Sequence, residues 1–308
     1  MTFNANPEPK NIEASVRARL QNKAQETGRP FAEVFQYYGM ERFLYRLSQS
    51  KYADTFVLKG ALMFVVWKVP GMRTTRDIDF LGRFNNEIIG IEDAFRKICS
   101  MVVPQDGLIF NPETIKGERI KEDADYEGVR IKFTGFLGKA RIPMQVDIGF
   151  GDVVFPKPKT INYPAILDFP SAHLKGYAAE TVVAEKFEAM IKLGHLNSRM
   201  KDFYDIWLMA RQFQFSGEEL SQAIRRTFEH RGTSFPKEIP FFAAEIYNKL
   251  SDRQKLWKAF LGKMEIKNAP DELCEIARAI ESFLLEPAKA ISDGRDFTAH
   301  WHAPGPWH

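Results

Sequence analysis

Two aspartates separated by one residue, Asp77 and Asp79, lie in the segment RTTRDIDFLG. Residues two apart on a β-strand project from the same face, so these carboxylates would lie side by side while Ile78 and Phe80 point into the core. Adjacent carboxylates repel each other, and a divalent cation such as Mg²⁺ removes that repulsion. Nucleotidyl transfer needs this arrangement, with metal ions about 3.5–4 Å apart that clamp the attacking and leaving oxygens. Asp-x-Asp is also frequent in exposed strands and turns, so neighbouring motifs must support the interpretation.

Two neighbouring segments add such support. Lys59-Gly60 in VLKGAL forms a predicted strand–glycine–helix junction, at which backbone amides can approach a phosphate. An ordinary tight turn is the alternative. Downstream, QVDIG places Asp147 in an otherwise apolar strand, where a lone acid is unfavourable unless it is paired or bound to metal. A salt bridge to Arg130 or Arg141 would also satisfy Asp147.

Two further charged segments lie on predicted helices. Lys186 falls on the apolar stripe of ETVVAEKFEAMIKLG, where a lysine either extends its amine to solvent or reaches into a site as a phosphate ligand. In NSRMKDFYDIW, Arg199 and Asp202 are spaced i,i+3, and Lys201 and Asp205 are spaced i,i+4. Two surface ion pairs are the simplest interpretation of that spacing.

The elements that must position these residues follow from hydrophobic period and from Gly and Pro breaks. Strands are predicted at 55–58, at 75–81 and through 107–150, where 116–125 is expected to be a polar loop. An extended segment is predicted for 155–170. Helices are predicted over 11–25, 31–49, 61–67, 85–101, 179–193, 199–212, 217–230, 241–249, 252–261 and 270–285.

This order of elements predicts an α+β protein with a small mixed sheet between helical parts. A helical lead-in is expected over 1–52, an α/β core over 53–170 and a helical C-terminal domain over 171–286. The last stretch, 287–308, contains Pro, Gly and three histidines and is expected to be a mobile tail. His300, His302 and His308 could bind metal adventitiously, but a mobile end is the preferred interpretation.

The composition of the chain indicates which broad class of protein it belongs to. The chain has 308 residues, of which 44% are hydrophobic and 27% charged, as in ordinary globular proteins. It has no apolar run long enough to span a bilayer and no signal-peptide pattern, so we expect a cytoplasmic protein without membrane contact. The two cysteines, Cys99 and Cys274, are expected to be buried thiols.

A formal net charge of +3 is too small to indicate nucleic-acid binding by charge alone. Any RNA contact would need a local patch, although a solvated face is the default interpretation. The candidates for such a patch are Arg17, Arg19, Lys23, Arg225, Arg226 and Arg231.

Five segments together resemble the AbiEii/AbiGii toxin family of nucleotidyltransferases, whose fold is similar to that of polymerase-beta-like enzymes. They occur in the family's order within about residues 31–228, as FVLKGALMF, RTTRDIDFLG, QVDIGFGD, ETVVAEKFEAMIKLG and NSRMKDFYDIW. The resemblance implies that Asp77 and Asp79 bind metal and that Asp147 is a third acid, acting as metal ligand or as base.

The resemblance also implies roles for the remaining segments. Lys186 matches the lysine that contacts the nucleotide phosphates, and Asp202 matches a functionally important acid. The other residues expected to bind nucleotide are Lys59, Gly60, Ala61, Arg76, Arg199 and Lys201. Two positions depart from the family pattern, because Ala61 replaces the usual Ser or Thr and Gln145 replaces a basic residue found in some members. Either change could weaken nucleotide binding or alter its specificity.

The function implied is transfer of a nucleotide from an NTP to an acceptor, with Mg²⁺ or Mn²⁺ and with release of pyrophosphate. The expected acceptor is RNA, in particular tRNA, although a protein acceptor stays open. The expected setting is a toxin–antitoxin or phage-defence system with a cognate antitoxin as partner. The alternative is a weak or inactive nucleotide- or RNA-binding module of the same fold, which Ala61 favours. A metal-dependent phosphodiesterase is disfavoured because it would usually use His ligands.

Overall fold

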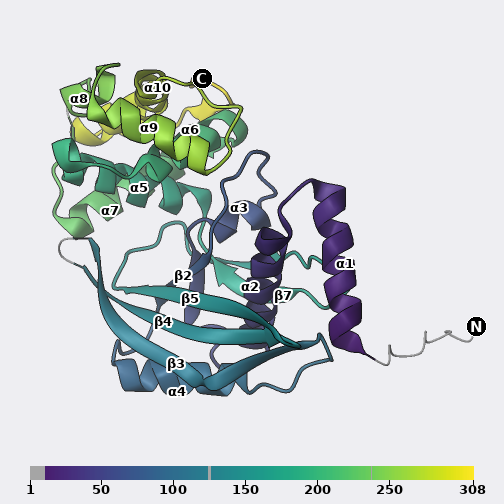
Figure 1. The fold of residues 1–308 in the computed structure, drawn as a ribbon. Coiled ribbons are helices and arrows are strands. Elements are labelled where there is room, and N and C mark those ends of the chain that lie inside the picture. The colour runs from purple at the N-terminus through teal and green to yellow at the C-terminus, as the bar shows by residue number, and fades with distance from the viewer. Residues whose placement is uncertain (1–10, 124–125, 237) are drawn as a thin grey trace, which may run out of the picture. The chain divides into compact units, whose positions relative to one another are not determined.

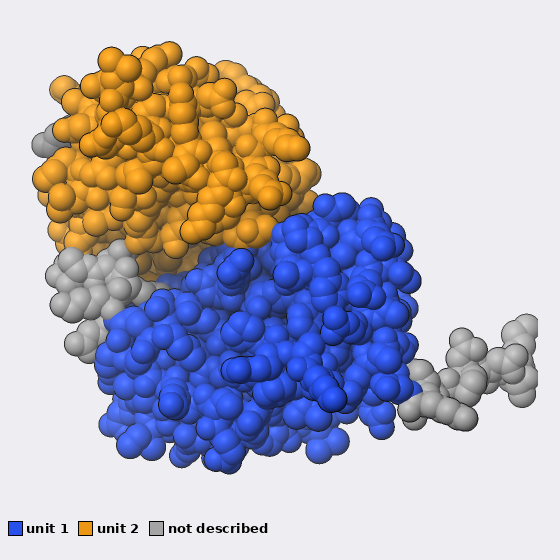
Figure 2. Space-filling view, viewed as in Figure 1, with its two compact units in different colours: residues 1–66, 75–151, 160–176 blue, residues 67–74, 152–159, 177–308 orange. Residues whose placement is uncertain are grey.

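A computed structural model describes residues 11–123, 126–236 and 238–308 of the chain. The chain divides into two compact units, which Figure 2 distinguishes by colour. Unit 1 comprises residues 1–66, 75–151 and 160–176, and unit 2 comprises residues 67–74, 152–159 and 177–308. Each unit is therefore built from several separate segments of the chain.

Unit 1 contains a seven-stranded mixed sheet with strand order β3-β4-β5-β2-β1-β7-β6 (Figure 1). The strands are β1 (Phe56–Lys59), β2 (Asp77–Gly82), β3 (Leu108–Asp123), β4 (Tyr126–Leu137), β5 (Ala140–Phe150), β6 (Lys159–Tyr163) and β7 (Ala172–Gly176). β2 and β5 pair in parallel, as do β1 and β7, whereas β4 is antiparallel to both of its neighbours. The predicted α+β class and the mixed sheet are confirmed.

Helices cover one face of this sheet. Unit 1 contains α1 (Ile12–Thr27), α2 (Phe31–Gln49), α3 (Leu62–Val66) and α4 (Ile88–Cys99). Phe43 of α2 stacks on Phe95 of α4 at 5.4 Å between ring centroids, and both rings contact Phe133 of β4. Because side chains alternate across a strand, the polar residues of β2, β4 and β5 lie on the opposite face. We call that opposite face the open face.

Unit 2 is mainly helical from residue 179 onward. Its elements are α5 (Ala179–Leu193), η1 (Gly194–Leu196), α6 (Met200–Gln212), β8 (Phe215–Ser216), α7 (Gly217–Arg231), α8 (Ala244–Tyr247), α9 (Asp252–Lys263), α10 (Leu273–Ser292) and β9 (His300–Trp301). Across the described ranges, no helix combines the length and the apolar character that crossing a bilayer requires. Cys99 in unit 1 and Cys274 in unit 2 are both buried free thiols, as predicted.

Two parts of the sheet differ from the sequence prediction. The polar segment 116–125 was expected to be a loop, but β3 continues to Asp123 and pairs with β4 through this region. Its charged residues show no two-residue alternation, so its place in the sheet follows from the pairing with β4, and residues 124–125 of the predicted loop lie outside the described ranges. β7 lies beyond the boundary expected near residue 170 and pairs with β1 inside unit 1.

The C-terminal segment also differs from the predicted mobile tail. α10 continues to Ser292, and Trp301 in the following segment is only 3% exposed. The Trp301 indole donates a hydrogen bond to the Ala210 carbonyl at 2.7 Å, and the Trp307 indole donates to the Phe283 carbonyl at 2.8 Å. Burial of Trp301 and the stacking of half-buried Trp307 on Phe283 outweigh the turn-forming composition on which the prediction rests.

Candidate metal centre

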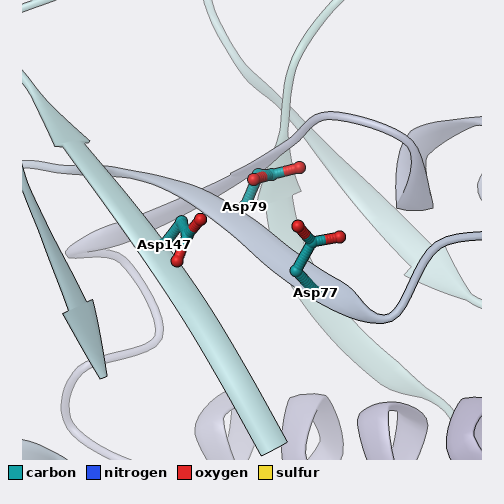
Figure 3. A group of neighbouring side chains, drawn as sticks. All are labelled: Asp77, Asp79 and Asp147. Carbon is teal, nitrogen blue, oxygen red and sulfur yellow. The ribbon is translucent and has the colours of Figure 1, made fainter. Parts of the chain in front are cut away.

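Three aspartates meet on the open face of the unit 1 sheet. The parallel register of β2 and β5 places Asp79 opposite Asp147 and Asp77 opposite Gln145. Carboxylate oxygens from the three aspartates lie within 4.8 Å of one another (Figure 3). Ile78 and Val146, one residue away, are fully buried on the other face, as the alternation predicts. We refer to Asp77, Asp79 and Asp147 as the acid triad.

The donor set of the acid triad fits a divalent cation. Mg²⁺ and Mn²⁺ prefer oxygen ligands, and one or two carboxylates usually suffice when phosphate and water complete the coordination. Within the described ranges, the acid triad is the one group of three or more neighbouring Asp, Glu, His or Cys side chains that could hold a metal ion. The tail histidines do not form such a group.

Asp147 also has a basic partner within the sheet. Arg130 lies opposite Asp147 in the β4–β5 register and donates from Nε to Oδ1 at 2.8 Å and from Nη2 to Oδ2 at 2.7 Å. The hydrogen bond to Asp147 raises the pKa of the Arg130 guanidinium. Of the two arginines suggested by the sequence, Arg130 is therefore the partner. Each carboxylate oxygen has a second lone pair, so this salt bridge leaves coordination sites on Asp147.

Asp77 is held by the residues that precede it. The Thr75 hydroxyl donates a hydrogen bond to Asp77 Oδ1. Thr75 is itself fixed, because its backbone N–H donates to the Tyr37 hydroxyl at 3.2 Å. Thr75 is not among the predicted site residues, although a hydroxyl residue two positions before an aspartate in the predicted strand 75–81 is a detectable signal. The adjacent Arg76, predicted to bind nucleotide, has an exposed side chain.

The predicted glycine junction lies directly against the acid triad. Gly60 follows β1 with φ +70°, and a β-carbon at this position would collide with the carboxylate of Asp79. Lys59 lies opposite Asp79 in the β1–β2 register and is 8% exposed. Ala61 is 5% exposed and carries no hydroxyl. The structure therefore brings Lys59, Gly60 and Ala61 to the same end of β1 as Asp79.

The helical residues predicted to be functional form an ion-pair network inside unit 2. Lys186 Nζ lies 2.7 Å from Asp202 and 2.9 Å from Asp205. Arg199 Nε lies 2.6 Å from Asp202, and Arg73 pairs with both oxygens of Asp205 at 3.0 Å. Asp202 is fully buried. We call these five residues the unit 2 ion network.

The network corrects two details of the sequence prediction. The Arg199–Asp202 pair is present, but Asp205 binds Lys186 and Arg73 instead of Lys201, whose side chain is exposed. The pairs are also internal and not on the surface. Spacing along one helix could not reveal Arg73, which lies more than a hundred residues earlier in the chain.

Opposite charges keep this network ionised despite its burial. Burial alone would raise the pKa of Asp202, but the charges of Lys186 and Arg199 outweigh it, and the pKa lies well below its ordinary value. Burial would lower the pKa of Lys186, but Asp202 and Asp205 outweigh it, and that pKa is raised. The network therefore remains charged around neutral pH.

Some of the arginines proposed for a basic patch are already engaged. Arg231 is 7% exposed in its side chain and pairs with Glu188 at 2.7 Å and with Asp152 at 2.9 Å. It is therefore an internal residue of unit 2 and not a surface contact. Arg19 pairs with Asp168 at 3.0 Å at the surface of unit 1. Arg226 is exposed and lies over the Phe155 ring at 4.2 Å.

Comparison with known proteins identifies the family of the chain. Among solved structures, the chain is similar to a provisionally assigned nucleotidyltransferase from H. pylori, with 13% identity, a TM-score of 0.47 and coverage of 82% of this chain and 96% of that one. A second similar structure is JHP933 from Helicobacter pylori, with 13% identity, a TM-score of 0.40 and coverage of 82% and 93%. No curated protein sequence matches the chain. The sequence model of the nucleotidyl transferase AbiEii toxin of type IV toxin–antitoxin systems matches residues 42–284. This match covers most of the chain, which therefore belongs to the AbiEii nucleotidyltransferase toxin family.

Proposed function

We propose that this chain transfers a nucleotide from an NTP to an RNA acceptor, with a divalent metal held by the acid triad. The convergence of Asp77, Asp79 and Asp147 within 4.8 Å on one sheet face carries this proposal. Membership of a nucleotidyltransferase family supports the reaction class.

Each residue of the site has a role that follows from its place. Asp77 and Asp79 would be the principal ligands of Mg²⁺ or Mn²⁺. When bound, the metal would neutralise charge that develops on the phosphate oxygens and on the leaving pyrophosphate. Asp147 would complete the ligand set or accept the proton of the attacking hydroxyl. Thr75 and Arg130 would fix the orientation of Asp77 and Asp147 through the hydrogen bonds described above.

The glycine junction would shape the nucleotide side of the site. Gly60 leaves room for the Asp79 carboxylate, so that Asp79 can face the metal without displacing β1. Lys59 and Arg76 are proposed to contact nucleotide phosphates as cations. Lys186, Arg199 and Lys201 are further proposed nucleotide ligands, by the family resemblance alone, with Asp202 as their acidic partner.

The toxin–antitoxin setting follows from the family and implies an antitoxin partner. Nucleotide transfer to tRNA would explain toxicity, because a tRNA altered at its acceptor end cannot be charged. A non-catalytic nucleotide- or RNA-binding module is the second candidate. Ala61 favours it, because the usual hydroxyl beside the phosphate site is missing. The complete acid triad argues against it, since three clustered carboxylates have no evident use in a passive module.

Incubation with Mg²⁺, each α-³²P-labelled NTP in turn and total tRNA tests the proposal. The wild type should place label on RNA, and Asp79→Ala should not. Label on protein would keep the enzyme class and replace the acceptor. Absence of labelled product with every NTP, from folded protein and a broad set of acceptors, would favour the binding module.

A further inference from the structure

Exposed cations continue from the acid triad across the open face. In the sheet register, Asp77 lies opposite Gln145 of β5, Gln145 opposite Lys132 of β4, and Lys132 opposite Lys116 of β3. Arg141 lies on the same face, four residues before Gln145 on β5. Adjacent strands are about 4.8 Å apart, so the backbone of Lys132 lies about 10 Å, and that of Lys116 about 14 Å, from the backbone of Asp77. One row of residues thus leads from the metal ligands to two lysines.

These cations are available to a ligand. Lys116 and Arg141 are exposed, and neither forms an ion pair with any part of the chain that the structure describes. Lys132 is 53% exposed in its side chain and pairs with Glu118 at 2.6 Å. Exposed ion pairs of this kind contribute little to stability, so an incoming phosphate can replace Glu118.

An apolar pair lies beside the cations. Ile109 of β3 and Phe136 of β4 are opposite each other in the antiparallel register, and Phe136 is in turn opposite Arg141 of β5. Ile109 is 66% exposed, and Phe136 is partly exposed. Leu108 and Leu137 form the neighbouring pair in the register and are buried on the helix-covered face. Because side chains alternate along each strand, Ile109 and Phe136 lie on the open face. We call Ile109, Lys116, Lys132, Phe136 and Arg141 the open-face strip.

We infer that the open-face strip binds single-stranded acceptor RNA, with phosphates at Lys116, Lys132 and Arg141 and a base against Phe136. Single-stranded nucleic acid is bound by cationic surfaces that follow the backbone and by aromatic rings on which bases stack. With one phosphate per about 3.4 Å of a stacked strand, three or four nucleotides would reach from Lys116 to the acid triad. This inference rests on the proposed function, because it identifies the surface that delivers the acceptor to the triad.

The chemistry of the strip favours RNA over a protein partner. An acidic protein would account for the cations, and an apolar protein for Ile109 and Phe136. A strand of RNA accounts for both, since each nucleotide offers an anionic phosphate and a flat base. The strip also lies in register with the acid triad, as an acceptor surface must.

Direct RNA binding without nucleotide tests the inference separately from catalysis. The probe is a fluorescein-labelled single-stranded RNA of about 12 nucleotides, within the range that single-strand binders cover. Fluorescence anisotropy at several salt concentrations gives the affinity and its salt dependence for the wild type, Lys116→Glu/Arg141→Glu and Phe136→Ala. The matched control is Lys51→Glu/Lys97→Glu, which makes the same charge change at exposed residues of unit 1 outside the open-face strip.

The expected results differ between the variants. Lys116→Glu/Arg141→Glu should bind RNA at least about tenfold more weakly and reduce the salt slope by about 1.4, since each lost single-strand phosphate contact removes about 0.7. Phe136→Ala should weaken binding about 5- to 100-fold with little change in the slope. The control should bind like the wild type, and equilibrium dialysis should show the same affinity for labelled ATP with Mg²⁺ in every variant.

Three results would overturn the inference: no RNA binding by the wild type, equal losses in the control double variant, or no loss in the strip variants. Binding of the cognate antitoxin, but not RNA, that depends on the strip would reassign the surface to a protein partner. If the wild type binds RNA through the strip but transfers no nucleotide, the inference stands and the proposed function fails.

Discussion

The Arg130 guanidinium holds both carboxylate oxygens of Asp147, at 2.8 and 2.7 Å, on neighbouring strands of the open face. Asp147 is only 11% exposed in its side chain, whereas Arg130 is 30% exposed. The third acid of the triad therefore has a resident counter-ion before any metal binds. Arg130 fixes the carboxylate in one orientation and offsets part of the repulsion among the three acids.

Replacement of Arg130 should make the protein more dependent on metal. Arg130→Gln is expected to lower the stability of the metal-free protein by about 1–3 kcal/mol, because Asp147 loses its partner while it remains largely buried. Thermal unfolding should then show a larger stabilisation by Mn²⁺ than in the wild type. Arg141→Gln is the control, because Arg141 is an exposed residue of the same face without an ion pair among the described residues. Equal effects of both substitutions would mean that Arg130 does not act through Asp147.

Gly60 should be indispensable for the position of Asp79. Gly60→Ala combines a positive φ with a collision between the new methyl group and the Asp79 carboxylate, so metal binding and nucleotide transfer should fall by about 100-fold or more. Gly28→Ala is a matched control, since Gly28 has φ +66° and a β-carbon there would meet nothing within 4 Å. Gly28→Ala should lose only about 1–2 kcal/mol of stability and keep its activity. An active Gly60→Ala variant would contradict the proposed placement of Asp79.

Local spacing was enough to predict part of this site. The i,i+2 spacing of Asp77 and Asp79 predicts a shared face, and the strand–glycine–helix pattern around Gly60 predicts the junction. The neighbours of these residues depend on sheet pairing between distant segments. The contact of Asp79 with Asp147 follows from the parallel β2–β5 register, which no local pattern encodes. The choice of Arg130 over Arg141 likewise depends on the β4–β5 register.

The dependence on contacts between distant segments also explains where the sequence-based prediction of the fold differs from the structure. Segment 116–125 is polar and has no two-residue alternation, which favours a loop, and only the pairing with β4 shows that residues 116–123 belong to a strand. Arg231 was a candidate for a basic surface, but its partners Asp152 and Glu188 come from other segments of unit 2. The helices predicted over 31–49 and 179–193 have the same bounds in the structure.

Lys186 should be essential for the stability of unit 2. Lys186→Met leaves the buried carboxylates of Asp202 and Asp205 with one cation fewer. The free energy of unfolding is therefore expected to fall by about 3–5 kcal/mol. Denaturant unfolding followed by tryptophan fluorescence measures the change. Lys201→Met, an exposed lysine of the same segment, should unfold like the wild type. A Lys186→Met variant of unchanged stability would mean that its charge is dispensable to the fold and available for nucleotide binding alone.

Glu41 should make the stability of the protein depend on pH. Burial raises the pKa of Glu41 to about 7, although the adjacent Arg42 charge opposes this shift. Between the ordinary pKa near 4.5 and the folded value near 7, the folded state retains a proton that the unfolded state releases. The contribution of Glu41 to stability is therefore greatest below about pH 4.5 and falls as pH rises to 7, by about 3 kcal/mol in all.

Glu41→Gln removes this titration. The difference in unfolding free energy between the wild type and Glu41→Gln, measured in urea from pH 5 to 8, should fall with pH and level off above 7. A difference that stays constant, or that rises with pH, would show that Glu41 is ionised in the folded protein throughout this range.

Metal binding by the acid triad is the claim on which the proposed chemistry depends. The direct measurement is calorimetric titration of Mn²⁺ into the wild type, Asp79→Asn and Asp93→Asn, each with a saturating non-hydrolysable NTP analogue. Asp93 is the control, since it is 56% exposed in its side chain on α4 and lies outside the triad. We predict that the wild type and Asp93→Asn bind Mn²⁺ with equal affinity and that Asp79→Asn binds it at least tenfold more weakly. Equal Mn²⁺ affinity in the wild type and Asp79→Asn would contradict a metal centre at the triad.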